Sequence, residues 1–113
     1  MDIERVIQEY VPGKQITLAH IIANPDDEVY VKIGVTQSNK KAIGIMTITP
    51  SETAIIAVDL AVKAADVEID FVDRFTGSLI ISGDISSVKE AFQEVTKVLA
   101  NVLEFNINSI SVS

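Results

Sequence analysis

Two groups of residues at the start of this sequence are of types that could do chemistry. The single histidine, His20, could act as a general base or a metal ligand, and the carboxylates of Asp26, Asp27 and Glu28 could hold a hard cation. The chain has no second histidine and no cysteine to complete a metal site around His20, and the three acids lack the spacing of an EF-hand loop. We therefore expect a structural or interface histidine, and acids that complement the positive end of a helix dipole.

A second set of candidate side chains surrounds a predicted turn and a predicted helix start. Asp70, Asp73 and Arg74 could form a carboxylate pair for acid–base work, but a solvated turn is the commoner meaning of such a cluster. The hydroxyls of Thr49 and Ser51 are explained by helix capping, so neither is assigned as a nucleophile. The sequence therefore predicts no catalytic residue, no metal site and no cofactor.

The composition restricts the classes of partner. The chain has 113 residues, with sixteen acids against nine bases and a net charge of −7, which describes one acidic domain. Phosphate binding draws its affinity from clustered lysine and arginine, so nucleic acids and anionic membranes are poor candidate partners. No apolar run approaches the roughly 20 residues that span a bilayer, and the first residues do not resemble a secretory signal. We expect a cytosolic protein.

The elements that must position these residues follow from hydrophobic periodicity and turn residues. Residues 42–113 read β-α-β-β-α-β, an order that packs two helices on one face of a mostly antiparallel sheet. We therefore predict an α+β sandwich. The expected strands are 15–23, 42–49, 67–73, 79–82 and 105–112. The expected helices are a short one from residue 24 to about residue 33, one over residues 49–65, and one that begins at residue 86 or 87.

The helix expected over residues 49–65 has both a start signal and an unusual surface. Thr49 can cap it, Pro50 suits the first helical position, and Glu52 completes a capping box. Its apolar residues extend beyond one core-facing stripe, which indicates a second buried contact, and a mean hydropathy of +0.34 favours burial against copies of the same chain. The stripe comprises Ala54, Ile55, Val58, Ala61, Val62 and Ala65, and the residues off it are Ile56, Ala57 and Leu60.

The ordered segments resemble the shell subunits of bacterial microcompartments over nearly the whole chain. The segments that carry the resemblance are 42–46 (AIGIM), 63–67 (KAADV), 73–78 (DRFTGS), 82–84 (SGD) and 88–91 (VKEA). A strand, a proline and a short acidic helix that come last in standard-order members stand first here, at residues 19–28, which indicates a circular permutation. Residues 7–15, 48–52 and 73–77 are similar to permuted shell proteins of ethanolamine, propanediol and choline utilisation.

The resemblance implies a homohexameric tile with a central pore, in a shell that encloses enzymes in the bacterial cytoplasm. It divides the single domain into residues 1–14, which cap the pore, 15–41, which form the permuted strand and short helix, and the core, 42–113. The implied pore loop is Arg74, Phe75, Thr76 and Gly77, and the implied hexamer edge is Lys63, Asn24 and Pro25. The implied partners are copies of this chain, other shell proteins and the targeting peptides of cargo enzymes.

The amino-terminal segment is ambiguous from its own pattern. Its apolar residues fall at helical spacing, but Pro12 and Gly13 cut the segment shorter than a stable isolated helix. In the permuted relatives, six such segments form a small β-barrel over the pore, so the resemblance makes this segment a barrel strand. That strand comprises Val6, Ile7, Gln8, Glu9, Tyr10 and Val11.

Two other classes of function stay open at this point. Sandwiches of this element order also serve as small-molecule-binding regulatory domains, although this sequence shows no ligand fingerprint. An enzyme is the third hypothesis, and His20 would have to carry its chemistry.

Overall fold

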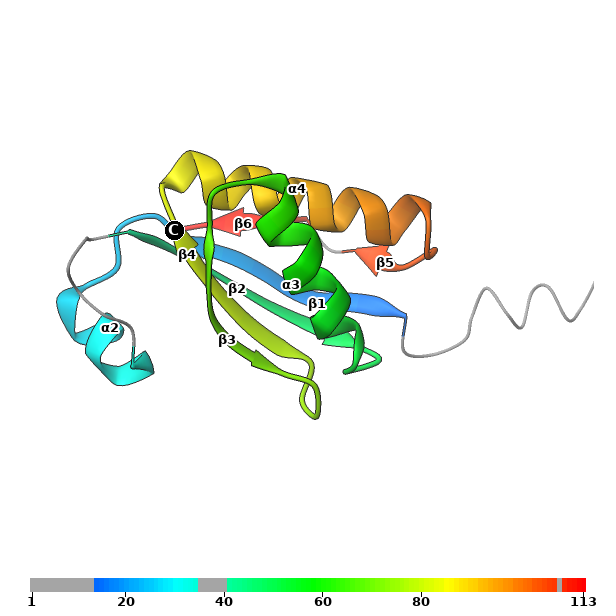
Figure 1. The fold of residues 1–113 in the computed structure, drawn as a ribbon, viewed down its shortest axis with the longest axis horizontal. Coiled ribbons are helices and arrows are strands. Elements are labelled where there is room, and N and C mark those ends of the chain that lie inside the picture. Colours follow the sequence, from blue (N-terminus) through cyan, green and yellow to red (C-terminus); the bar gives the residue numbers. More distant parts are fainter. Residues whose placement is uncertain (1–13, 35–40, 108) are drawn as a thin grey trace, which may run out of the picture.

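The computed structural model describes residues 14–34, 41–107 and 109–113, and these form one sheet with helices packed on it (Figure 1). The expected strand of residues 6–11 lies outside the described residues. The strands are β1 (Gln15–Ile22), β2 (Ala42–Thr49), β3 (Glu68–Asp73), β4 (Ser78–Gly83), β5 (Asn106–Ile107) and β6 (Ser111–Val112). The helices are α2 (Asp27–Ile33), α3 (Thr53–Ala64) and α4 (Ile85–Asn101).

The sheet order is β3-β4-β2-β1-β5, with β6 also paired to β1. The neighbours from β3 to β1 are antiparallel, whereas β5 and β6 run parallel to β1. Helices α3 and α4 lie together on one face of the sheet (Figure 1). The predicted α+β class, element order and mostly antiparallel sheet are confirmed.

The carboxyl-terminal strand differs from its prediction. One strand was expected over residues 105–112, but among the described residues of this segment the pairing with β1 is confined to Asn106–Ile107 and Ser111–Val112. The two pairings keep one register along β1, opposite Gln15–Ile16 and His20–Ile21. A β-bulge between Ile16 and Leu18, in the pairing of β1 with β2, falls between them, and a bulge bends the strand that carries it.

Helix α4 supplies the larger part of the helical core. Its buried residues recur at three- and four-residue spacing as the sequence predicts, and they are Val88, Ala91, Phe92, Val95 and Leu99. The helix ends at Asn101, and the Val102 side chain after it is exposed. The Phe92 ring packs against Gly44 of β2, where an added Cβ would lie 2.8 Å from Phe92 Cζ. A glycine in β2 therefore allows the close approach of α4.

Helix α3 begins at Thr53, so the predicted capping box is wrong. Thr49 is held in the sheet opposite Gln15, and residues 50–52 form a turn before the helix starts. The backbone N–H groups of Thr53, Ala54 and Ile55 donate to the carbonyls of this turn. The N-cap is Glu52, which makes no side-chain cap bond. The chain must leave β2 and reverse direction before it can become helical, and local spacing does not reveal that.

The short helix α2 begins at its acidic residues, as the sequence predicts. Asp26 is its N-cap and accepts a hydrogen bond from the Glu28 N–H at 3.0 Å, with Asp27 and Glu28 in the first turn. Tyr30 is buried, and its hydroxyl donates to the backbone carbonyl of Lys41. This contact ties α2 to the residue just before β2.

Candidate functional site

The turn between β3 and β4, residues 74–77, has a fixed backbone. Asp73 Oδ1 accepts a hydrogen bond from the Phe75 N–H at 2.8 Å, and this bond is the main reason that the pKa of Asp73 is lowered. The Gly77 N–H donates to the Asp73 carbonyl, and the Gly77 carbonyl accepts from Ile48 at 2.8 Å. Gly77 has a φ of +77°, and an added Cβ would lie 2.0 Å from the Ile48 carbonyl oxygen. The turn is therefore anchored to the end of β2 and requires glycine.

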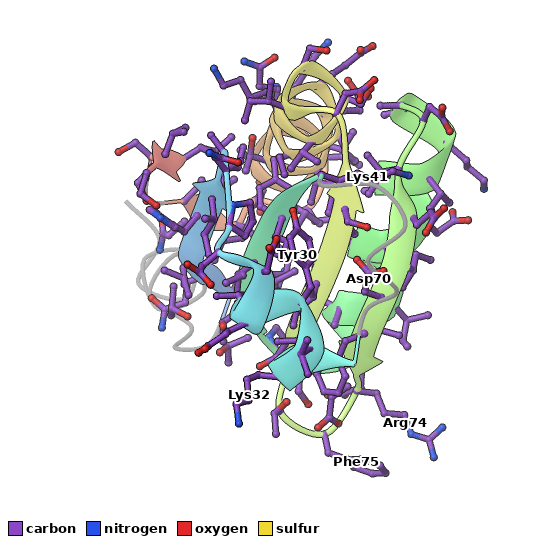
Figure 2. All side chains as sticks on the ribbon, turned by 90° about the vertical axis from the view of Figure 1, so that its left-hand side faces the viewer. Tyr30, Lys32, Lys41, Asp70, Arg74 and Phe75 are labelled. Carbon is purple, nitrogen blue, oxygen red and sulfur yellow. The ribbon has the colours of Figure 1, made fainter. Side chains whose placement is uncertain are left out.

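Two large side chains project from this turn. Phe75 is 79% exposed, and the Arg74 guanidinium carbon lies 4.9 Å from the centre of its ring. Figure 2 shows both side chains pointing away from the hairpin. A cation and an aromatic ring in contact at an exposed tip can bind an anionic group or pack against a neighbouring chain.

The predicted edge residues lie toward the other end of the sheet. Asn24 is exposed and Pro25 buried in the connection between β1 and α2. Lys63 is near the carboxyl end of α3, and its ammonium donates to Asp59 Oδ2 at 2.8 Å. Just after α3, the backbone at Asp66 passes close to Gly83 at the end of β4. A Cβ added to Gly83 would lie 3.0 Å from the Asp66 carbonyl oxygen. Gly83 pairs with Ala42 at the start of β2, and the end of β1 before Asn24 pairs with the same part of β2. The turn of residues 74–77 lies beside the other end of β2, so both predicted edge sites lie away from it.

His20 is held by the carboxyl-terminal segment. Its Nδ1 lies 2.6 Å from the Ser111 hydroxyl and its Nε2 lies 2.7 Å from the Ser113 hydroxyl. The Ser113 backbone N–H also donates to the Ile21 carbonyl at 2.8 Å. The imidazole therefore fastens β6 to β1, which agrees with the structural reading of His20. The serines at alternating positions 109, 111 and 113 were the available signal for this contact, and sequence reasoning missed it.

Asp70 lies in a half-buried polar cluster, so its expected place in a solvated turn is wrong. A β-bulge between Ile69 and Phe71 leaves Asp70 unpaired within β3. Its Oδ2 atom is buried, and no group in the described part of the chain hydrogen-bonds to it. Burial raises the pKa of Asp70, and the Glu68 charge raises it further. The hydrogen bond with Ser82 and the Lys41 charge lower this pKa, but by less than burial raises it. Figure 2 shows Asp70 below Lys41.

We expect Asp70→Asn to stabilise the protein at neutral pH. Because the pKa of Asp70 is raised by folding, its stabilising contribution exists at low pH and is lost as pH rises through the folded-state pKa. The gain at pH 7 is about 1 kcal/mol or less, because water screens a partly exposed group. Thermal unfolding at pH 4 and pH 7 measures this gain, which should shrink at pH 4. Asp66→Asn, at an exposed turn residue, is the matched control, and an equal gain there would contradict the assignment.

A surface groove of about 420 Å³ runs between α3 and α4. Two lysines, two glutamates, one glutamine and two apolar residues line it, and they are Leu60, Lys63, Ala64, Glu90, Gln93, Glu94 and Lys97. Among the described residues, no group of three or more histidine, aspartate or glutamate side chains is placed to hold a metal ion. In the same part of the chain, no helix is both long and apolar enough to cross a membrane.

Comparison with known proteins decides the family. A family model described as "BMC domain" matches residues 42–111, which is more than half of the chain. The chain belongs to the BMC-domain family. It is 55% identical over 107 residues to the bacterial microcompartment shell protein EutS of Escherichia coli K12, covering 95% of each chain. It is 53% identical over 108 residues to the shell protein PduU of Salmonella typhimurium, covering 96% of this chain and 92% of that one.

A solved structure extends the BMC-domain match to the fold. The structure described as "CutR flat hexamer, form 1" matches with a TM-score of 0.87 at 50% identity, covering 91% of this chain and 94% of that one. The resemblance to microcompartment shell proteins is therefore confirmed.

Proposed function

We propose that this chain is a structural, non-enzymatic shell subunit of a bacterial microcompartment and assembles as a homohexameric tile in the bacterial cytoplasm. The observation that carries the proposal is identity above 50% to shell proteins over nearly the full length. The similarity to the chain of a flat CutR hexamer supports the hexameric state. These relatives suggest an ethanolamine, propanediol or choline utilisation compartment.

The hexamer is tested by its absolute mass, measured by light scattering coupled to size exclusion. We expect about six times the subunit mass of 12.2 kDa, or larger sheets built from that unit. A monomer or dimer at micromolar concentration would contradict the tile. It would favour the alternative function, a small-molecule-binding regulatory domain.

In this tile, we place residues 74–77 around the central opening and Lys63, Asn24 and Pro25 at the outer edge. The support is the separation of the two groups toward opposite ends of one sheet, as a radial subunit requires. Arg74 and Phe75 project from their turn, so six copies would surround the opening with guanidinium and aromatic groups. Other shell proteins are the proposed neighbours at the edge, and cargo targeting peptides are further partners.

Lys63→Ala should weaken the assembly of hexamers into sheets and leave the hexamer intact. The exposed Lys63 ammonium is available to a neighbouring tile, whereas its pairing with Asp59 within α3 is worth only about 0.3–0.5 kcal/mol. Electron microscopy of the assemblies and light scattering of the hexamer measure the two effects. Lys97→Ala, in the same groove, is the control. Loss of the hexamer itself in Lys63→Ala would contradict the edge position.

We also propose that residues 1–14, as the segment ahead of the permuted strand, contribute the β-barrel that caps the pore, with Val6 to Val11 as its strand. Deletion of residues 1–11 should open the pore and leave the core folded, because the described residues by themselves form a buried cluster that joins the sheet to α3 and α4. Electron microscopy of the hexamer and thermal unfolding measure the two effects. A collapse of thermal stability would show instead that the segment belongs to the core.

A further inference from the structure

Arg74 carries a positive charge that the fold of one chain leaves unpaired. It is exposed, and it is the single arginine in the part of the chain that the structure describes. Its guanidinium contacts the Phe75 ring but makes no ion pair and no hydrogen bond with any of the described residues. Its N–H donors therefore remain available, although the chain has sixteen acids against nine bases.

Two carboxylates close to this turn accept hydrogen bonds from other donors. Asp73 Oδ1 accepts from the Phe75 N–H at 2.8 Å. Glu52 Oε1 accepts from the Ser51 hydroxyl at 2.9 Å. Ser51 lies beside the turn, because a Cβ added to Gly77 would be 3.0 Å from Ser51 Cα. Both acids are thus engaged within their own segments, and neither neutralises the guanidinium.

An unpaired guanidinium is suited to binding oxyanions. It is planar, keeps its charge across the physiological pH range, and presents a fork of donors that matches the oxygen atoms of carboxylate and phosphate groups. A single exposed guanidinium binds such a group weakly, because water screens the charge. Several guanidinium groups around one opening produce a much stronger positive potential. An anion site at this turn therefore requires more than one copy of the chain.

We propose that the six Arg74 side chains of a hexamer form one binding site for a small multivalent anion, a phosphate ester or a polycarboxylate, at the centre of the ring. The inference rests on the proposed placement of residues 74–77 around the central opening. Six guanidinium groups there repel one another, and an anion that accepts hydrogen bonds from several subunits relieves this repulsion. An anion with one charge and few oxygen atoms cannot reach several subunits, so the site should prefer multivalent anions.

The turn holds Arg74 in a restricted position before any anion binds. The Gly77 N–H donates to the Asp73 carbonyl and the Gly77 carbonyl accepts from the Ile48 N–H, both at 2.8 Å. The Phe75 ring, whose centre is 4.9 Å from the guanidinium carbon, limits the positions of the arginine side chain further. Figure 2 shows both side chains pointing away from the hairpin. Phe75 is therefore a positioning residue of this site, because restraint before binding lowers the entropy lost on binding.

The first experiment titrates inorganic pyrophosphate into the full-length protein by isothermal calorimetry, on a sample whose mass is measured by light scattering. We expect saturation at one pyrophosphate per hexamer, competition by citrate and no competition by acetate. The relative affinities of pyrophosphate and citrate show which of the two classes of anion the site prefers. Six pyrophosphates per hexamer, or no saturable binding at millimolar concentration, would overturn the shared site.

The second experiment repeats the titration with Arg74→Gln and a matched control. Arg74→Gln removes the charge-assisted hydrogen bonds and should lower the affinity for pyrophosphate at least about tenfold, in a hexamer of unchanged mass. Lys89→Gln removes the same charge from an exposed position near the start of α4, at the end of the sheet away from residues 74–77, and should leave the affinity unchanged. An unchanged affinity in Arg74→Gln, or equal losses in the two variants, would contradict the site.

The role of the ring is tested by two further variants. Phe75→Leu should weaken pyrophosphate binding about two- to fivefold, and Phe75→Tyr, which keeps an aromatic ring, should bind as the parent does. Equal affinities in Phe75→Leu and the parent would contradict the positioning role. The mass separates the two possible failures. A chain that is no hexamer overturns the proposed tile together with this site, whereas a confirmed hexamer that takes up no pyrophosphate overturns the anion site alone.

Discussion

Gly77→Ala is expected to lower the stability of the protein by about 3 kcal/mol or more, because two separate costs fall on one position. A left-handed φ of +77° costs a residue with a Cβ about 1–2 kcal/mol. The added Cβ would also lie 2.0 Å from the Ile48 carbonyl oxygen, a backbone atom that cannot move aside as a flexible side chain can. Relief of that overlap must break the bond from the Ile48 N–H to the Gly77 carbonyl.

The control for this prediction is Gly34→Ala at the end of α2. Gly34 has nearly the same φ, +78°, but an added Cβ there would meet no atom of the described residues within 4 Å. Gly34→Ala should therefore show the cost of the backbone conformation alone. Thermal unfolding at one fixed protein concentration measures both variants, since the midpoint of an oligomer depends on concentration. Equal losses would show that the turn of residues 74–77 is not anchored to β2.

Elements with strong periodicity were predictable from the sequence, and elements fixed by distant contacts were not. The apolar spacing of α4 identified its buried face, because packing and periodicity agree there. The start of α3 was misplaced because Thr49 is held in the sheet by Gln15, more than thirty residues away in the chain. The bulge at Asp70 and the split of the last strand likewise depend on pairing partners that a local pattern does not contain.

The candidate site was reached from the sequence through resemblance, since none of its residues has a chemical signature of its own. Arg74 and Phe75 have the composition of an ordinary exposed turn, and Lys63 that of an ordinary helix end. Their proposed roles depend on where six copies place them, which the periodicity of one chain cannot encode. What the sequence did signal was the excess of apolar residues on α3, and the structure shows that Ile55 and Val62 account for part of it.

Phe92→Ala should cost about 3–5 kcal/mol, the range for deletion of a fully buried aromatic side chain. Gly44→Ala should cost about 1–3 kcal/mol through overpacking, because its Cβ would lie 2.8 Å from Phe92 Cζ and 2.9 Å from Val88 Cγ1. Since the alanine methyl group at position 44 enters space that the Phe92 ring fills, the double variant should lose less than the sum of the two single losses.

Chemical denaturation of the single and double variants measures the coupling between the two sites. Residues in direct contact couple by about 0.5–3 kcal/mol, and here the sign should be favourable because the missing ring makes room for the methyl group. Gly83→Ala combined with Phe92→Ala is the additive control, because the neighbours of Gly83 are Asp66 and Val67 rather than Phe92. Additive losses in the Gly44 pair would mean that α4 does not depend on the glycine of β2 for its approach to the sheet, and that some other contact sets the spacing between the two layers.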